Sequence, residues 1–376
     1  MRRYRLKSSV EPLTTADGAL FLIRAGDDDL AIRDASPADA ALLELLAAEE
    51  PTLDRITDRL GLDADAARSK LEALAAAGVL TAAAASPGLD AEDAERFSRQ
   101  LPYLADLGDA HALQRALADA RVTVIGCGGL GTWAVAALAG AGVRRLRIVD
   151  DDVVERSNLN RQILYSPADL GVPKVEAAAA WLRAFDERIE VEAVQRRVEG
   201  VEAAIEVVDG ADAVVLVADW PPYALARWVN AACVPRRIPF ITGGQLPPIV
   251  KLGPLYDPGR TACFACHERG LQDGPGYDAY ARRLATAPAR GATLATASGM
   301  VGTALASDVV HRLVGAPVAT AGAALLLDLR TLSTRREPIE RDPACPVCQP
   351  QWRQTGTPSA GAMSSASGAE TGSPTS

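Results

Sequence analysis

A cluster of glycines directly behind a short apolar run is the first pattern in this sequence that could do chemistry. The run is 122–125 (VTVI), and the glycines are Gly126, Gly128, Gly129 and Gly131. Glycines let backbone N–H groups approach phosphate oxygens closely at the start of a helix. Asp150 ends the next apolar run, at the separation expected of an acid that accepts hydrogen bonds from ribose hydroxyls. These residues predict a nucleotide site, but alone they fit any dinucleotide-binding protein.

Two Cys-x-x-Cys pairs predict a metal site. They are Cys263 with Cys266 and Cys345 with Cys348. Four thiolates fill the tetrahedral shell of Zn²⁺ and leave no open position, which is typical of a structural zinc ion. Disulfides or unliganded core thiols are the alternative. Zinc is favoured because a long chain without an export signal is expected in a reducing compartment.

A polar run follows Asp150 and has no evident use in packing. Residues 150–162 read DDDVVERSNLNRQ, and the side chains in it that could contact a nucleotide are Asp152, Asn158, Arg161 and Gln162. A run of this kind directly after the predicted ribose-binding acid makes the prediction more specific than a general dinucleotide-binding fold.

Three further charged residues complete the set. Lys174 opens a helix, Asp219 follows a buried type of strand, and Arg99 lies in the segment RFSRQL at 96–101. Singly, they could be an exposed first-turn lysine, a helix N-cap and a solvated arginine. In this order around the glycine turn and the cysteine pairs, the set resembles the ThiF/MoeB/HesA type of activating enzymes, which are related to ubiquitin-activating enzymes.

The resemblance implies an ATP-dependent adenylyltransferase in which a carboxylate attacks the α-phosphate and expels pyrophosphate. Two anions must meet, so positive charge has to surround the phosphates. Arg161 and Lys174 would contact them in cis and Arg99 in trans from a second subunit, which implies a homodimer. Asp219 would hold Mg²⁺. The implied nucleotide-binding residues are Gly126, Gly128, Gly129, Gly131, Asp150, Asp152, Asn158, Arg161, Gln162 and Lys174.

Two features depart from the family pattern. Trp220 stands after Asp219, where activating enzymes commonly carry Asn. Members that form a thioester or persulfide use a cysteine in the crossover segment, and residues 267–344 contain none. Cys127 and Cys233 lie in the glycine turn and an apolar helix, positions suited to packing. The reaction is therefore expected to proceed without enzyme-bound sulfur, as in peptide-modifying members of the microcin C type.

Strands and helices alternate from residue 121 to residue 244. Such alternation predicts an α/β fold with a doubly wound, Rossmann-like sheet, whose ligands bind outside the carboxyl ends of the strands. Asp150, Arg161 and Asp219 all fall at or just beyond such ends.

Residues 1–82 predict a small winged-helix-like α+β domain. A hairpin (4–13 and 19–24) precedes three helices, which begin near Ser36, Thr52 and Asp63. The region holds ten Lys or Arg against fifteen Asp or Glu, so a phosphate-reading helix would be repelled and nucleic acid is excluded. It resembles the leader-peptide recognition domains of peptide-modifying enzymes, and a helical cap or dimerisation extension is the alternative.

Composition sets the remaining expectations. The chain has 376 residues, 48% of them hydrophobic, and a net charge of -9. No apolar run of membrane-spanning length or secretion signal appears, which predicts a cytoplasmic protein without a membrane partner. We expect a linker at 83–92, the adenylylating domain at 93–348 and a disordered tail, rich in Ser, Gly and Thr, at 349–376.

These observations favour activation of the C-terminal carboxylate of a ribosomally made peptide as acyl-AMP. Activation of a ubiquitin-like sulfur carrier, in molybdopterin or thiamine biosynthesis, is the first alternative. A non-catalytic leader-binding scaffold is the second. An NAD-dependent dehydrogenase is the weakest, because the polar run and the cysteine pairs have no use in it.

Overall fold

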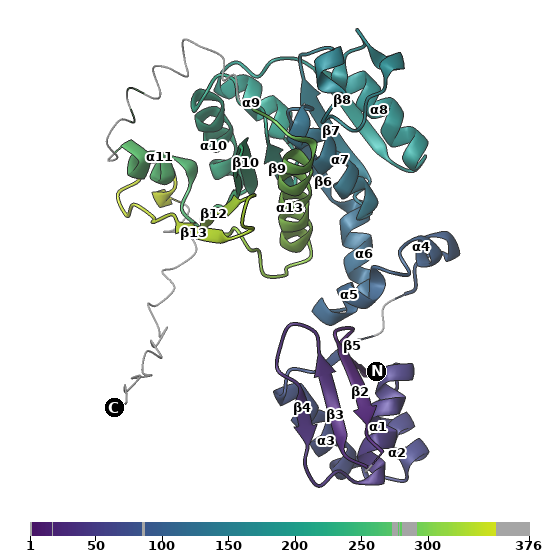
Figure 1. Ribbon diagram of the computed structural model, residues 1–376. Coiled ribbons are helices and arrows are strands. Elements are labelled where there is room, and N and C mark those ends of the chain that lie inside the picture. Colours follow the sequence, from purple (N-terminus) through teal and green to yellow (C-terminus); the bar gives the residue numbers. More distant parts are fainter. Residues whose placement is uncertain are drawn as a thin grey trace, which may run out of the picture.

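The computed structural model describes residues 2–16, 18–84, 87–272, 277, 279 and 292–350. The chain forms a small N-terminal unit and a larger α/β unit, with three short helices between them (Figure 1). The predicted disordered tail lies almost wholly outside the described residues, which end at Pro350.

The N-terminal unit contains five strands and three helices among its described residues. Their bounds are β1 Arg2–Leu6, β2 Val10–Thr14, β3 Leu20–Arg24, β4 Leu30–Ile32, α1 Pro37–Ala48, α2 Leu53–Leu60, α3 Ala64–Ala76 and β5 Leu80–Ala84. Ser36, Thr52 and Asp63 cap the three helices with their side chains, as their residue types predict. A core of leucines from α1, β1 and β3 holds the unit together.

The predicted hairpin is only part of the strand pairing. β2 and β3 form it, and β4 extends it to a three-stranded antiparallel sheet. The apolar run at 4–13 is divided between two strands, because β1 leaves the hairpin and pairs antiparallel with β5, some 75 residues later. The winged-helix-like outline is therefore closed by a second sheet of two strands.

Three helices connect the units, namely α4 Ala91–Arg96, α5 Leu101–Leu107 and α6 Ala110–Asp119. Asp106 of α5 makes the main polar contact with the N-terminal unit. Its carboxylate accepts hydrogen bonds from the backbone N–H of Ser8, at 2.8 Å, and from the guanidinium of Arg5, also at 2.8 Å. α4 is bound to the larger unit by Asp93, which pairs with Arg144 and Arg188. These ion pairs hold the pKa of Asp93 below its usual value.

The larger unit is built on one sheet in the order β13-β12-β11-β10-β9-β6-β7-β8. The five strands from β8 to β10 are parallel, and β11, β12 and β13 continue antiparallel. Their bounds are β6 Arg121–Ile125, β7 Arg145–Asp150, β8 Glu190–Gln195, β9 Ala213–Leu216, β10 Phe240–Leu246, β11 Ile249–Tyr256, β12 Ala323–Asp328 and β13 Thr334–Pro338. The predicted doubly wound α/β sheet is confirmed.

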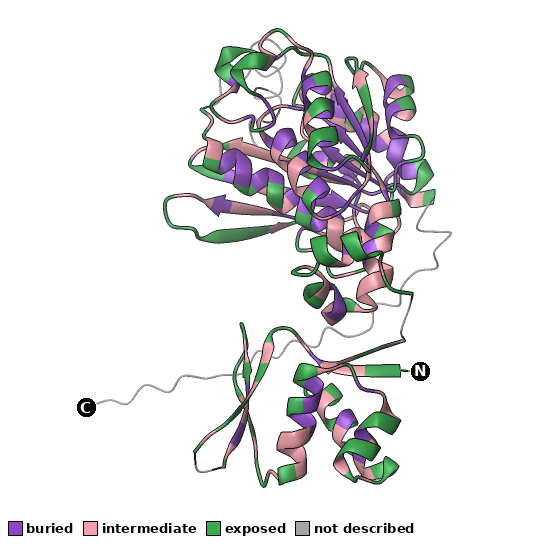
Figure 2. Ribbon diagram, turned by 90° about the vertical axis from the view of Figure 1, so that its right-hand side faces the viewer, coloured by how far each residue is buried: buried purple, intermediate pink, exposed green. Residues whose placement is uncertain are grey.

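Helices cover both faces of this sheet, and the central strands are buried between them (Figure 2). The helices are α7 Gly129–Gly140, α8 Lys174–Phe185, α9 Val201–Val208, α10 Ala224–Arg236, α11 Phe264–Gln272 and α13 Ala295–Leu313. α7, α8 and α13 pack on one face, and α9 and α10 pack on the other. No helix among the described residues is long and apolar enough to cross a membrane.

Candidate functional site

A cavity of about 720 Å³ opens at the carboxyl ends of the parallel strands. It lies where the strand order reverses: β7 and β8 continue from β6 in one direction, and β9 and β10 continue in the other. Open α/β sheets bind ligands at this switch point. The predicted residues that line it are Gly126, Gly128, Gly129, Asp150, Asp152, Arg161, Gln162, Lys174 and Asp219. We call this space the nucleotide cavity.

The glycine turn is shaped by close backbone contacts. Gly126 has a φ of 103°, and a Cβ there would lie 2.6 Å from the backbone nitrogen of Ala218. A Cβ on Gly131 would collide with the carbonyl oxygen of Gly126. Gly131 therefore packs the helix against the strand and does not line the cavity. Gly128 caps α7 without a side-chain hydrogen bond, so the first backbone N–H groups of α7 face the cavity, where a phosphate would bind.

Asp150 ends β7 with its carboxylate already oriented. It accepts hydrogen bonds from the backbone N–H groups of Cys127, at 2.6 Å, and Asp152, at 2.9 Å. Burial raises the pKa of Asp150, and the charge of Lys174 opposes that rise. Cys127 itself is completely buried in the turn, as a packing residue would be.

Lys174 is the first residue of α8 and is only 6% exposed. Its amine pairs with the carboxylate of Asp152 at 2.7 Å, and its backbone N–H donates to the carbonyl of Asp152 at 2.9 Å. An exposed first-turn lysine is therefore the wrong description of this residue. Among the described residues that line the cavity, Lys174 is the one buried cation, and the exposed carboxylate of Asp152 pairs with it.

The polar run after Asp150 forms a loop that places Arg161 in the cavity. Asn158 is buried and accepts a hydrogen bond from the backbone N–H of Glu155 at 3.0 Å, so it shapes the loop and does not line the cavity. The guanidinium of Arg161 donates to the carbonyl of Ser157 at 2.9 Å. The indole of Trp133 donates to the carbonyl of Arg161 at 3.1 Å.

Asp219 follows β9, exposed on the wall of the cavity, and Trp220 lies beside it at 42% exposure. Magnesium is usually bound through one or two carboxylates together with substrate phosphates. Asp219, on the same cavity as the carboxylates of Asp150 and Asp152, fits such a site. The role of Asp219 stays a prediction.

Arg99 lies outside the nucleotide cavity. It is exposed in the turn between α4 and α5, and it is not among the residues that line the cavity. A contact in trans would need a second subunit, so its predicted role stays a prediction.

Two arginines that the sequence interpretation missed also line the cavity. Arg196 and Arg197 follow β8, and Arg197 pairs with Asp151 at 2.8 Å. Their only signal was position, because they stand just beyond the carboxyl end of a parallel strand. They add two guanidinium groups to the lining of the cavity, where Arg196 pairs with Glu206 and Arg197 with Asp151.

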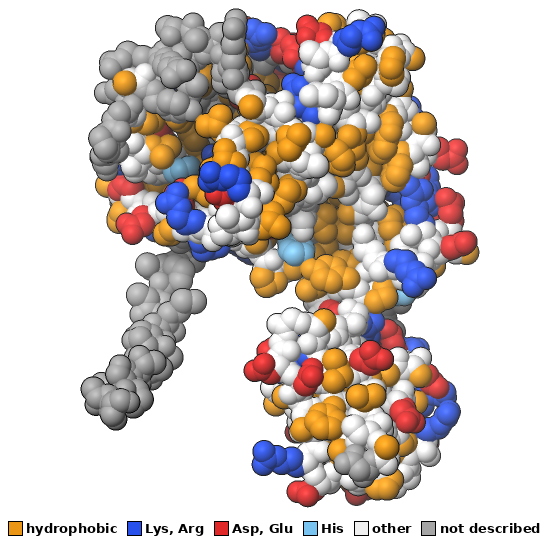
Figure 3. Space-filling model, in the orientation of Figure 1, with side chains coloured by type: hydrophobic (Ala, Val, Ile, Leu, Met, Phe, Trp, Pro, Cys, Tyr) orange, Lys and Arg blue, Asp and Glu red, His pale blue; other side chains and the backbone are white. Residues whose placement is uncertain are grey.

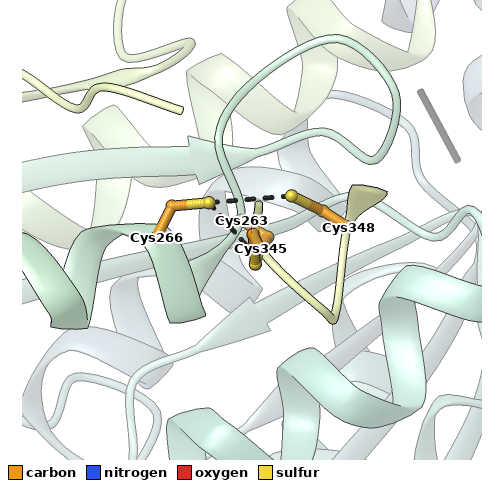
Figure 4. A group of neighbouring side chains, drawn as sticks. All are labelled: Cys263, Cys266, Cys345 and Cys348. Carbon is orange, nitrogen blue, oxygen red and sulfur yellow. Dashed lines mark hydrogen bonds between the residues drawn. The ribbon is translucent and has the colours of Figure 1, made fainter. Parts of the chain in front are cut away.

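The four predicted zinc ligands come together in one buried cluster (Figure 4). The Sγ of Cys263 lies 3.9 Å from the Sγ of Cys266 and 3.7 Å from the Sγ of Cys345. The Sγ of Cys266 lies 3.6 Å from that of Cys348. A tetrahedron with Zn–S bonds of about 2.3 Å has edges of about 3.8 Å. The thiols are too far apart for disulfides and at the right separation for one zinc ion, so the geometry favours zinc over the alternatives.

The cluster of four cysteines ties α11 to the C-terminal loop. His267 stands next to Cys266 in the sequence. Its Nδ1 shares a hydrogen bond of 2.6 Å with the hydroxyl of Tyr256. Burial, helped by the charge of Lys251, lowers the pKa of His267 to about 4. His267 is therefore held by Tyr256, outside the set of four sulfur ligands.

A second recess lies in the N-terminal unit. It is an apolar groove of about 450 Å³ between β4 and helices α1 and α3. Its apolar lining includes Leu22, Leu30, Ile32, Leu42 and Leu74. Asp39 and Lys70 pair at 2.5 Å on its rim. β4 is the outer strand of its sheet, so the described part of the unit leaves its second edge unpaired beside the groove.

Known proteins resemble the larger unit in sequence and the whole chain in fold. The ThiF family model matches residues 97–347. The SAMP-activating enzyme E1 of Haloferax volcanii is 34% identical over 267 residues, which is 69% of this chain and 90% of that protein. The sulfur carrier protein ThiS adenylyltransferase of Escherichia coli is 36% identical over 264 residues, 68% of this chain and 95% of that protein.

A solved structure extends the likeness to the N-terminal unit. The crystal structure of E. coli MccB with MccA-N7isoASN superposes with a TM-score of 0.74 at 22% identity. The match covers 92% of this chain and 99% of that one. At this identity the likeness establishes the fold.

The doubly wound sheet, the glycine turn and the cation-lined cavity define a nucleotide-binding enzyme with a cysteine-rich structural centre. The matched region identifies it further, since the chain belongs to the ThiF family. It is an adenylyltransferase, and ATP is the nucleotide that this activity uses. The non-catalytic scaffold and the dehydrogenase are thereby excluded.

Proposed function

We propose that the protein adenylylates the C-terminal carboxylate of a ribosomally made peptide, which the N-terminal unit holds. In this reaction the carboxylate oxygen bonds to the α-phosphorus of ATP, the bond to the bridging oxygen breaks, and pyrophosphate leaves. The product is a peptidyl-AMP mixed anhydride.

Several residues of the nucleotide cavity have a role in this proposal. The N–H groups of the glycine turn and Arg161 bind phosphate oxygens, and Asp150 binds the ribose. Lys174 exchanges Asp152 for the triphosphate, which carries more negative charge than one exposed carboxylate. Asp219 holds Mg²⁺, which neutralises phosphate charge when bound. These residues lower the repulsion between the substrate carboxylate and ATP.

The single observation that carries the peptide assignment is the groove beside the free edge of β4. Extended peptides bind such edges by adding a strand, and an adjacent apolar groove accepts alternate side chains. The fold supports this reading, since the superposition with MccB spans 92% of the chain. Sequence similarity to the enzymes named for sulfur carriers covers only 68% of it.

Activation of a sulfur carrier protein is the second candidate. Its support is sequence identity of 33–36% with enzymes named for such carriers. That candidate gives the N-terminal groove no role. It also finds no cysteine in the crossover, because residues 267–344 contain none.

We further propose a homodimer in which Arg99 reaches the partner's nucleotide. Apolar side chains gather over α13 and α5 on the face shown in Figure 3. They include Tyr103 at 46% exposure, Leu107 at 36% and Met300 at 38%. A surface of this kind favours burial against a second copy. Sedimentation at several protein concentrations tests it: a monomer at micromolar concentration would contradict the proposal.

ATP–pyrophosphate exchange tests the proposed function. The substrate is the short peptide encoded beside the gene, and the comparison substrate is a ubiquitin-like carrier ending in Gly-Gly. Exchange with the peptide and its loss in Lys174→Ala support the proposal. Exchange with the carrier alone supports the second candidate, and exchange with neither contradicts both.

A further inference from the structure

Lys251 is the one lysine of the larger unit that the nucleotide chemistry does not use. The chain has only four lysines, at positions 7, 70, 174 and 251. Lys70 pairs with Asp39 and Lys174 pairs with Asp152. Among the described residues, no hydrogen bond or ion pair engages the amine of Lys251, although the residue is partly buried.

Strand register places this amine near the nucleotide cavity. Lys251 of β11 lies opposite Gly244 of β10, and Gly244 lines the cavity. The side chain of Lys251 runs over Gly244, because its Cε lies 4.0 Å from the position of a Cβ on that glycine. Gly243 faces the opposite side, toward Val301 and Leu305 of α13. The missing side chain at Gly244 thus leaves a path between the amine and the cavity.

The electrostatic surroundings compensate the burial of the amine only in part. Burial lowers the pKa of Lys251, and Glu337 is the acid that opposes this effect. Glu337 already pairs with Arg335 at 2.8 Å. A partly desolvated amine without a partner is costly, so an anion placed beside it is strongly favoured.

The acyl substrate can supply that anion, because the geometry of the reaction brings it to the wall of the cavity at β10. The phosphate-binding cations Arg161 and Lys174 belong to the loop after β7 and to α8, whereas Gly243, Gly244 and Gln245 form the wall at β10. Nucleophile and leaving group lie roughly in line at phosphorus. With pyrophosphate held at the cations, the acyl group approaches along β10, beside Lys251.

The geometry points to Lys251 as a specificity residue that binds an acidic side chain on the last or penultimate residue of the acyl substrate. This inference deepens the proposed function and rests on it. The ammonium donates to the substrate's Asp or Glu carboxylate and remains outside the bond-making step. A charged hydrogen bond of this kind discriminates an acid from its amide by about tenfold.

Non-hydrolysable acyl-adenylate mimics test the inference. The probes are aminoacyl sulfamoyl adenosines carrying Asp, Asn, Glu or Gln, and the same four residues placed before a terminal Gly. Calorimetry with the full chain is expected to show that at least one acidic probe binds about tenfold more tightly than its amide. Lys251→Met keeps the length of the side chain and removes its charge, so this preference disappears while ATP affinity is unchanged. Lys7→Met, in the N-terminal unit, is the matched control and keeps the preference.

The remaining outcomes distinguish failure of the Lys251 role from failure of the proposed adenylylation. Equal binding of every acid and its amide by the unaltered protein overturns the role of Lys251 and leaves the adenylylation intact. A preference that survives in Lys251→Met does the same. Failure of every probe to bind, in a protein that still binds ATP, overturns the proposed acyl-adenylate chemistry as well.

Discussion

The nucleotide cavity and the apolar groove of the N-terminal unit differ in how they are prepared for their ligands. In the cavity, charged side chains are already held in place: Asp152 positions Lys174, and two backbone N–H groups position Asp150. The groove is lined mainly by apolar side chains, and the unpaired backbone N–H and C=O groups of β4 are available for hydrogen bonds beside it. In the proposed function, chemistry depends on fixed charges and peptide recognition depends on an unpaired strand edge. The two regions lie on separate cores joined through α5.

Disrupting the cluster of four cysteines should have the largest effect and should separate the two regions. We expect Cys345→Ser to destabilise the larger unit by about 4 kcal/mol or more, because a structural zinc contributes its binding energy to folding. The N-terminal unit has its own core and should keep its transition in calorimetry. Cys233→Ser, at a buried cysteine outside the cluster, is the control. Loss of the unfolding transitions of both units together in Cys345→Ser would contradict independent folding of the two units.

Lys174→Ala should abolish chemistry without touching recognition. Loss of a buried cation that stabilises transition-state charge costs about 10²-fold or more in turnover. The readout is pyrophosphate exchange, together with anisotropy of a labelled peptide, whose affinity should not change. Arg183→Ala, in the same helix α8 and outside the cavity, should behave as the unaltered protein. Weaker peptide binding in Lys174→Ala would show that the two regions are not independent.

The converse variant fills the groove. Ala73 is exposed on α3 and lines the groove, so Ala73→Trp should obstruct it and raise the KM for the peptide about tenfold, the loss of one well-packed contact. The KM for ATP should stay constant. Ala75→Trp is the matched control, because Ala75 is equally exposed on the same helix and does not line the groove. Equal effects of the two variants would rule the groove out as the peptide site.

The contact between the units should give the smallest effect. Asp106→Asn keeps an acceptor for the N–H of Ser8 and removes the ion pair with Arg5. Because that pair is only partly buried, we expect about a threefold rise in the peptide KM. Turnover at saturating peptide should not change. A change in the KM for ATP of the same size would place Asp106 in communication with the nucleotide cavity and contradict a purely positional role.

What the sequence could predict depended on local pattern. The glycine turn and Asp150 belong to one β-α-β segment whose geometry is fixed by close backbone contacts, so their placement followed from their order along the chain. The Cys-x-x-Cys spacing was sufficient to predict the cluster of four cysteines. The parallel order of the sheet followed from alternating strands and helices.

What it could not predict depended on pairing between distant segments. β1 joins β5 and not the hairpin, which only the folded unit decides. The burial of Lys174 comes from its pairing with the strand-end loop at Asp152, and Lys251 reaches Gly244 only through strand register. Arg196 and Arg197 had no motif at all. Such features need the assembled sheet, since the residues involved are far apart in the sequence.

The most direct measurement is mass spectrometry of the reaction with the neighbouring peptide, ATP and Mg²⁺ in the absence of pyrophosphatase. We expect a peptide that gains one AMP at its C-terminus. This adduct should disappear when pyrophosphate is added and should not form with Lys174→Ala. A peptide that remains unmodified while a Gly-Gly carrier gains AMP would contradict adenylylation of the peptide.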